Sequence, residues 1–333
     1  MPHLSRLQSA FLVAAMTAAA GPVFAGGSNY TVTPGSREVA GKISEWPVPT
    51  PRFARDPAVA LDGNIYIAVM RGNRIARFDP RSVSFHEWDL PRGAAPHGLV
   101  TDERGTIWYT GNGNATLGEL DPRTGSVQEH KVEGGGGPHT IIFDGKDSLW
   151  FTDQSANLVV RYDRAGKRMS VFKSRGNPYG LALDRGGNLW FCQLTGDRVG
   201  RIDARTGTVS EVFMGAGSAP RRIAAAPDGS LWVVLHGNGK LAKIEPEARR
   251  IAAEYAMPAG ENGNPYAVTV AGDGKVWANE IRTDTVALFD PKTEKFRVFQ
   301  LPSKDVGIRK MVVDGQGRLW YMGSHNGRLG VIE

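Results

Sequence analysis

The sequence predicts an all-β fold, a seven-bladed β-propeller whose blades are four-stranded antiparallel sheets. Three observations lead to this prediction. The 333 residues include 42 Gly and 20 Pro, spread along the whole length, which indicates many turns and argues against a helical bundle. A short apolar motif that ends in an aromatic residue recurs seven times at intervals of 40 to 45 residues, a spacing typical of propeller blades. The last copy is one strand short, and the N-terminal region carries a spare strand.

The recurring motif sets the number of blades. Each copy follows a polar turn and contributes one aromatic residue to a short strand, and the seven aromatic residues are Tyr66, Trp108, Trp150, Trp190, Trp232, Trp277 and Trp320. We expect each ring to pack between neighbouring blades, because large aromatic side chains dominate the energetics of cores. The rings are therefore not expected to form a binding platform.

The repeat that begins at Pro138 shows how one blade is built. Apolar or alternating stretches at 140–143, 148–152, 158–162 and 169–172 are separated by short polar turns rich in Asp and Gly. Short strands divided by such turns are typical of antiparallel sheets. The first strand of each repeat is expected to line the axis of the ring and the fourth to lie at its outer edge.

The two ends of the sequence predict how the ring closes. The seventh repeat ends with its third strand, at 328–332. Residues 41–47, Gly-Lys-Ile-Ser-Glu-Trp-Pro, match the fourth strands of other repeats. We expect this N-terminal strand to complete the last blade and so protect an otherwise exposed edge. The propeller is predicted to span residues 41–333 as a single domain, with residues 26–40 as a flexible leader.

Residues 1–25 are predicted to be a signal peptide. Arg6 precedes an apolar run that starts at Ala10, and small residues before position 26 suit signal peptidase. Export would place the mature protein in the periplasm or outside the cell. No membrane span is expected after cleavage, because no other stretch of about 18 apolar residues occurs.

Composition excludes several classes of protein. Cys192 is the single cysteine, so an intramolecular disulfide is excluded, and we expect this side chain to be buried in a strand. The net charge of +6 comes without a run of five basic residues, so nucleic acid is not an expected partner. No glycine-rich phosphate loop is present, so we expect no NAD or ATP. The protein is expected to be a monomer.

The repeat also predicts where a site would lie. Loops that enter the first strand of each blade, and loops between second and third strands, reach one face of the ring and surround the channel mouth. A proline opens most first strands, and the residue after it is expected to point to the axis at one height. These residues are His97, His139, Tyr179, Arg221, Tyr266, Arg309 and, from Asp56-Pro57-Ala58-Val59 in the first repeat, Ala58.

Residue types in this ring predict separate roles. His97 and His139 are candidate catalytic residues, since histidine titrates near neutral pH. Tyr179, Arg221, Tyr266 and Arg309 are candidate contacts for a small-molecule or peptide ligand. The second loop type adds Asp153 and Glu280, at the same place in their repeats, together with Gln193, His236 and His325. The two carboxylates are the candidate metal ligands, and Mg²⁺ is the candidate ion because it prefers oxygen.

Three short phrases of the repeats resemble a known family. Asn188-Leu189-Trp190-Phe191, Gly200-Arg201-Ile202-Asp203 and Pro96-His97-Gly98 resemble phrases of the virginiamycin B lyase family of seven-bladed propellers. The resemblance covers residues 41–333. It implies a carbon–oxygen lyase that linearises cyclic streptogramin depsipeptides by magnesium-assisted elimination.

The resemblance also implies roles for individual residues. In the family, His follows Pro in two consecutive repeats and Tyr follows Pro in the next, and His97, His139 and Tyr179 match this run. It implies His139 as the base, His97 as an orienting residue or acid, Tyr179 as a substrate contact and Asp153 as a metal ligand. Where the family has Glu before the Pro of the second Pro-His loop, this sequence has Gly137.

Two other functions remain open. The first is a hydrolase that opens lactones with a divalent metal, for which Asp153, Glu280 and Asn279 are the candidate ligands. The second is a non-catalytic exported propeller that binds an anionic ligand or a protein partner at the channel mouth. Positive charge at that mouth favours an anion and comes from Arg221, Arg222, Arg309 and Lys310.

Overall fold

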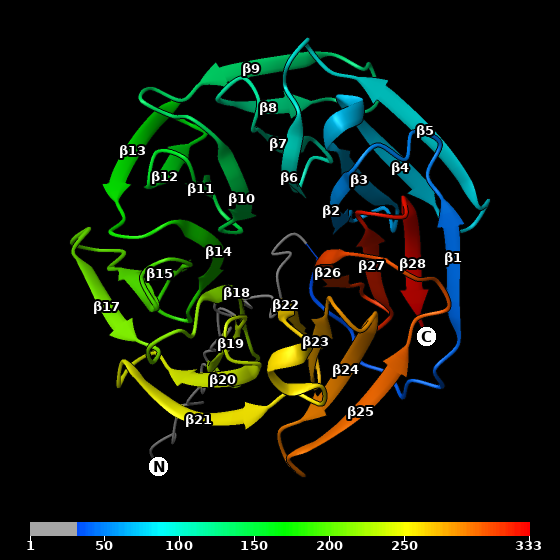
Figure 1. Cartoon of the computed structure of the whole chain (residues 1–333). Coiled ribbons are helices and arrows are strands. Elements are labelled where there is room, and N and C mark those ends of the chain that lie inside the picture. Colours follow the sequence, from blue (N-terminus) through cyan, green and yellow to red (C-terminus); the bar gives the residue numbers. More distant parts are fainter. Residues whose placement is uncertain (1–31) are drawn as a thin grey trace, which may run out of the picture.

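Seven four-stranded sheets stand around a common axis in the computed structural model, which describes residues 32–333 (Figure 1). The predicted signal peptide, residues 1–25, lies outside the described residues. In six sheets the strands follow chain order from the axis outward, and neighbouring strands pair antiparallel, as β10 to β13 do in the third blade. The all-β, seven-bladed propeller with four-stranded antiparallel blades is confirmed.

Blades one to four extend from Ala54 to Phe213. Their strands are β2 (Ala54–Val59), β3 (Ile65–Val69), β4 (Arg74–Asp79), β5 (Ser84–Asp89), β6 (Pro96–Thr101), β7 (Ile107–Gly111), β8 (Thr116–Leu120), β9 (Val127–Lys131), β10 (Pro138–Phe143), β11 (Ser148–Asp153), β12 (Leu158–Asp163), β13 (Arg168–Lys173), β14 (Pro178–Leu183), β15 (Leu189–Gln193), β16 (Arg198–Ile202) and β17 (Val209–Phe213).

Blades five to seven complete the ring. Their strands are β18 (Pro220–Ala225), β19 (Leu231–Leu235), β20 (Lys240–Glu245), β21 (Arg250–Ala256), β22 (Pro265–Val270), β23 (Val276–Glu280), β24 (Thr285–Asp290), β25 (Lys295–Gln300), β26 (Ile308–Val313), β27 (Leu319–Gly323), β28 (Arg328–Ile332) and β1 (Ile43–Pro47). Two 3₁₀ turns, η1 (Met70–Gly72) and η2 (Gly260–Asn262), are the helical segments assigned within residues 32–333. No helix in this part of the chain has the length and apolar character needed to cross a membrane.

The apolar core lies between the blades. Innermost strands such as β6 and β10 are buried along their whole length, whereas outermost strands such as β13 alternate between exposed and partly buried positions. Trp190 packs with Ile223 and Leu231 of the next blade, as predicted for the recurring aromatic residues. Cys192 lies in the same cluster and is fully buried, which confirms its predicted strand position.

The N-terminal strand closes the ring. β1 pairs antiparallel with β28, with Ile43 opposite Ile332 and Pro47 opposite Arg328, so the last blade has the order β1-β28-β27-β26 (Figure 1). The backbone N–H groups of Gly41 and Lys42 both donate to the Glu333 carbonyl at 2.9 Å. The predicted closure by residues 41–47 is therefore confirmed.

The described part of the predicted leader lies against the propeller. Gly35 donates its N–H to the Asp314 carbonyl at 2.8 Å and accepts from the Gly272 N–H at 2.9 Å. Val39 is buried in the core cluster of the last two blades, and Arg297 donates to its carbonyl at 2.6 Å. Residues 32–40 thus contact the first turns of blades six and seven.

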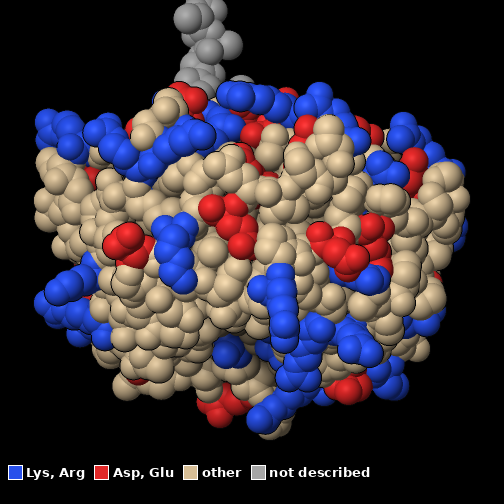
Figure 2. Space-filling view, turned by 90° about the horizontal axis from the view of Figure 1, so that it is seen from above, with Lys and Arg blue, Asp and Glu red and all other residues tan. Residues whose placement is uncertain are grey.

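On the outer surface, acidic and basic side chains are both spread over one side of the molecule (Figure 2).

Candidate functional site

Every innermost strand begins with the same irregularity, and this places seven side chains at one level. In blade two, Pro96 pairs with Gly111, and after a bulge the pairing resumes at Leu99 with Tyr109. The other six innermost strands show the same shift, so the second residue of each strand is equivalent in all blades. We call these residues the rim ring; in chain order they are Arg55, His97, His139, Tyr179, Arg221, Tyr266 and Arg309.

Blade one corrects the sequence prediction. The sequence predicts Ala58 in the ring, with Pro57 as the first residue of the strand. In the structure β2 begins at Ala54, which pairs with Val69, and Pro57 is its fourth residue, so Arg55 takes the ring position. The repeat spacing identifies the correct residue. Tyr66 precedes Trp108 by 42 residues, and the residue 42 positions before His97 is Arg55.

One arc of the rim ring brings the predicted catalytic residues together. The ring centroids of His97 and His139 lie 3.5 Å apart, and His139 lies 4.3 Å from Tyr179. All three side chains are buried. Arg55 donates to Nε2 of His97, which therefore acts as an acceptor and leaves the proton on Nδ1. That Nδ1 atom is buried and makes no hydrogen bond with any described residue.

The other arc is built from arginine and tyrosine. The hydroxyls of Tyr179 and Tyr266 are hydrogen-bonded to each other, and Arg309 Nη1 donates to Tyr266 at 3.0 Å. The Arg221 guanidinium lies 4.2 Å from the Tyr266 ring centroid and 5.2 Å from that of Tyr179. The predicted ligand contacts Tyr179, Arg221, Tyr266 and Arg309 therefore form one connected group.

Two histidines outside the ring position its arginines. His236 Nε2 lies 3.0 Å from Arg221 Nη1, and its Nδ1 donates to the Pro265 carbonyl at 3.1 Å. His325 Nε2 lies 3.1 Å from Arg309 Nη2, and its Nδ1 lies 2.7 Å from the Asp305 carboxylate. In each pair the histidine comes from the loop after the second strand of the arginine's own blade.

A second layer of charge closes the axis below the rim ring. Arg222 pairs with Asp56 across the channel at 3.1 Å and also donates to the Thr140 hydroxyl at 3.1 Å. Lys310 is buried beside them. The cavity that Thr140, Arg222 and Lys310 help to line measures about 10 Å³, which is about the space of one water molecule. A ligand at this site must therefore rest on the rim ring.

Burial and clustered cations shift the protonation of these groups. Burial, followed by the charge of Arg55, holds the pKa of His97 and of His139 well below the usual range. Burial also lowers the pKa of Lys310 to about 8. Burial alone would raise the pKa of Tyr266, but the positive charges of Arg221, Arg55 and Arg309 outweigh this effect and lower that pKa. At neutral pH both histidines are therefore uncharged.

Asp153 and Glu280 lie away from this group. The Asp153 carboxylate is fully buried and accepts from the backbone N–H groups of Gly136 and Gly137 at 2.9 Å. Glu280 accepts from the Ala259 N–H at 2.8 Å and from the Thr285 hydroxyl at 3.3 Å. These carboxylates hold the segments that lead into the innermost strands of their blades.

The donors present do not fit a Mg²⁺ site. The oxygens of Asp153 and Glu280 are already used by backbone N–H groups or hydroxyls, and they come from different blades. Across residues 32–333, no three His, Cys, Asp or Glu side chains gather in a way that could hold a metal ion. At the rim ring and the layer below it, Asp56 is the one carboxylate against five Arg or Lys side chains.

Comparisons with known proteins agree with this architecture. A curated virginiamycin B lyase from Nocardia farcinica is 30% identical over 138 residues, which are 40% of this chain and 46% of that protein. The aligned segment thus spans about half the length of the curated relative.

Solved structures show the likeness of fold along most of the chain. Virginiamycin B lyase from Staphylococcus aureus superposes with a TM-score of 0.79 at 20% identity, covering 88% of this chain and 99% of that one. A structure described as streptogramin B lyase gives 0.79 at 22% identity, with 88% and 97% covered. Hydrazine synthase from Kuenenia stuttgartiensis gives 0.73 at 14% identity, with 86% and 97% covered, so this likeness concerns the fold alone.

A family model decides the relationship. The model described as the virginiamycin B lyase family matches residues 31–173 and 92–333, which together span the whole propeller. On these grounds the chain belongs to the virginiamycin B lyase family.

Proposed function

We propose that the protein is a carbon–oxygen lyase that opens an ester bond of a cyclic depsipeptide or lactone by β-elimination at the rim ring. One observation carries this proposal. His97 and His139 lie 3.5 Å apart at the channel mouth with Tyr179 beside them, in the order of the family's His, His, Tyr run. Membership of the virginiamycin B lyase family supports the same class of reaction.

The base would be His139. Burial and neighbouring arginines keep the pKa of this side chain low, so it is unprotonated at neutral pH. It would take the proton from the carbon next to a carbonyl. A carbon–carbon double bond forms, the carbon–oxygen bond breaks, and its electron pair leaves on the ester oxygen as a carboxylate. His97, packed on the His139 ring and held by Arg55, would fix the orientation of the base.

Positive charge would come from the protein itself. The reaction develops negative charge on the carbonyl oxygen and then on the leaving carboxylate, and preorganised donors at such sites supply much of the rate enhancement of enzymes. Arg55, Arg221 and Arg309 stand in the rim ring for this purpose, and Tyr179 would contact the substrate. The described residues do not make a Mg²⁺ site, and no step here requires one.

A screen of cyclic depsipeptides and lactones, with and without Mg²⁺, tests the proposal. We expect His139→Ala to lower kcat/KM by about 10² to 10⁴, the usual range for losing a general base. His86→Ala is the matched control, since His86 is an exposed histidine of β5, and should retain activity. Product mass separates the reactions, because elimination leaves the mass of the opened substrate unchanged whereas hydrolysis adds one water. Unchanged activity in His139→Ala would exclude the assignment.

The second candidate is a propeller that binds an anionic ligand without catalysis. The surplus of cations at the channel mouth favours it, since five Arg or Lys side chains face one carboxylate in the two layers. Binding of a ligand with no turnover of any ester in the screen would select this function. A lactone hydrolase is the outcome in which the product gains one water.

We also propose export and a monomeric state for the mature protein. The predicted signal peptide at 1–25 supports a periplasmic or secreted location. The pairing of β1 with β28, which covers the edge that the third strand of the last blade would otherwise expose, supports a monomer. N-terminal sequencing of the protein recovered from the periplasm or medium and size-exclusion chromatography test these two statements. An uncleaved N-terminus or a dimer would contradict them.

A further inference from the structure

One aromatic residue at the channel mouth has an unusual backbone. Phe53, just before β2, has φ of 52°, in the left-handed region that bulky side chains rarely adopt. The equivalent residues in four other blades are small or well suited to this conformation, and they are Ala95 (φ 44°), Ala219 (φ 44°), Asn264 (φ 48°) and Gly307 (φ 67°). A phenylalanine at such a position costs of order 1–3 kcal/mol and persists where the surroundings demand it.

Three guanidinium groups converge on this ring. The Cζ atoms of Arg71, Arg55 and Arg309 lie 4.9, 5.1 and 5.4 Å from the Phe53 centroid. His325 stacks on the same ring at 6.4 Å. None of the three arginines forms an ion pair with a carboxylate of residues 32–333, although the structure contains many such pairs elsewhere. The cations therefore repel one another without a counter-charge.

Buried donors at this place are unused. The Nε atoms of Arg55 and Arg309 are buried and make no hydrogen bond with any described residue. A buried donor without a partner costs about 1–3 kcal/mol, so two of them beside one aromatic ring favour the binding of an acceptor there. Phe53 and Arg309 are only partly buried and Arg71 is exposed, so an acceptor can arrive from solvent.

We infer that Phe53 and the arginines around it form a binding site for a carboxylate group of the ligand. The planar fork of a guanidinium matches a carboxylate in two parallel hydrogen bonds. Arg71 is exposed and offers such a fork, and Arg55 and Arg309, on the same Phe53 ring, each add an unused Nε–H. Phe53 holds these groups together by contact with its ring face. The site adjoins His97, to which Arg55 donates. Identifying the ligand as the substrate rests on the proposed function, whereas the binding itself does not.

Calorimetric titration with succinate tests this site directly. We expect the wild-type protein to bind succinate, with weaker binding at higher salt, and not to bind the neutral analogue succinamide. Inorganic phosphate forms a second arm, and tighter binding of phosphate than of succinate would assign the site to phosphate and overturn the carboxylate. Absence of succinate binding at millimolar concentration would also overturn it.

Four variants locate the binding. Arg71→Gln, on an exposed side chain, and Arg309→Gln should each weaken succinate binding about tenfold. Phe53→Gly should weaken it similarly while unfolding at an equal or higher temperature, because Gly accepts the left-handed backbone. Arg123→Gln removes an equal charge from a distant exposed turn and should bind as the wild type does. Equal affinity in Arg71→Gln, Arg309→Gln, Phe53→Gly and Arg123→Gln would place the anion elsewhere.

The two proposals fail separately. Succinate binding without turnover of any ester would leave this site standing and exclude the lyase. Elimination that depends on His139, together with no succinate binding, would leave the lyase standing and exclude this site. His139→Ala should still bind succinate, because His139 is not among the groups around Phe53.

Discussion

His97 and His139 are buried as neutral imidazoles and are surrounded by arginine side chains. Burial, and then Arg55, hold the folded-state pKa of both well below the 6.5 of an exposed histidine, and burial lowers that of His236 to about 4. The unfolded chain therefore binds more protons than the folded protein once the pH drops below about 6.5. The free energy of unfolding must fall from there toward the folded-state pKa values.

We expect each such histidine to contribute up to about 1.4 kcal/mol per pH unit to this fall. Urea unfolding at pH 7.5, 6.5, 5.5 and 4.5 measures it. His139→Gln and His236→Gln should each flatten the dependence between pH 6.5 and 4.5, whereas His86→Gln, at an exposed position, should leave it as in the wild type. Identical slopes in all four proteins would mean that the buried histidines keep ordinary pKa values.

The site could be predicted from the sequence only where the repeat marks it. Proline at the start of five innermost strands led to His97, His139, Tyr179, Arg221 and Tyr266, and the repeat spacing added Arg309. Arg55 was missed because Pro57 lies three residues farther along the strand than the other prolines do. The hydrogen bonds of the Asp153 carboxylate could not be predicted, because its partners are backbone N–H groups whose position depends on the folded loop.

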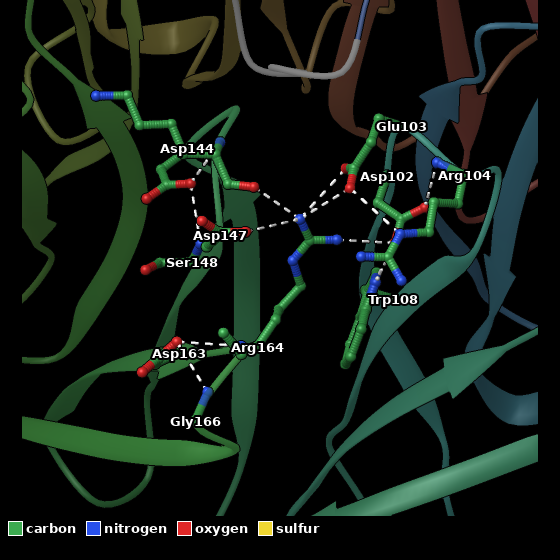
Figure 3. A network of polar contacts seen from close by, with 12 residues as sticks. Asp102, Glu103, Arg104, Trp108, Asp144, Asp147, Ser148, Asp163, Arg164 and Gly166 are labelled. Carbon is green, nitrogen blue, oxygen red and sulfur yellow. Dashed lines mark hydrogen bonds and ion pairs between the residues drawn. The ribbon is translucent and has the colours of Figure 1, made fainter.

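The first turn of blade two makes a contact with the neighbouring blade. In three blades an aspartate at the end of the innermost strand accepts from the indole N–H of the tryptophan six residues later, as Asp102 does from Trp108 at 3.0 Å. Arg164 reaches from blade three to Asp102 at 3.0 Å and to Glu103 at 3.0 Å (Figure 3). Its guanidinium also lies 4.5 Å from the Phe143 ring centroid.

Loss of Arg164 should destabilise this junction strongly. The Asp102 side chain is 3% exposed, so Arg164→Ala leaves a buried carboxylate without its charged partner, and we expect a loss of about 3 kcal/mol in the free energy of unfolding. Arg104→Ala is the control, because Arg104 is 77% exposed and its pair with Glu103 should contribute less than about 1 kcal/mol. Equal stability of the two variants in urea would contradict a structural role for the network.

Strands and turns of the blades follow from local sequence, whereas the cross-blade network does not. Alternating apolar residues and Asp-Gly turns predict the strands of residues 138–173 almost residue by residue. Arg164 and Asp102 are 62 residues apart, and nothing in the repeat pattern pairs them. Their contact becomes visible only when blades two and three stand side by side.

The whole ring is held shut by the pairing of its two ends. Glu45 in β1 accepts from the Tyr321 hydroxyl at 2.8 Å and pairs with Arg328 at 3.3 Å, and Trp46 packs on Phe78 of blade one at 4.9 Å. The strand β1 thus binds to the other strands of blade seven and also contacts blade one. The missing fourth strand of the last repeat made this closure predictable. The contacts of residues 32–40 with blades six and seven could not be predicted, because the sequence of that segment does not match any part of the repeat.

Deleting residues 26–48 should therefore open the molecule. The edge of β28 would be left unpaired, and such an edge recruits other chains, so we expect aggregation or unfolding in place of a monomer by size-exclusion chromatography. A permuted chain in which residues 41–48 follow Glu333 through a short turn is the matched control. Ile43 lies opposite Ile332, so a hairpin can restore the blade, and this protein should be a folded monomer. A stable monomer from the simple deletion would show that the ring closes without β1.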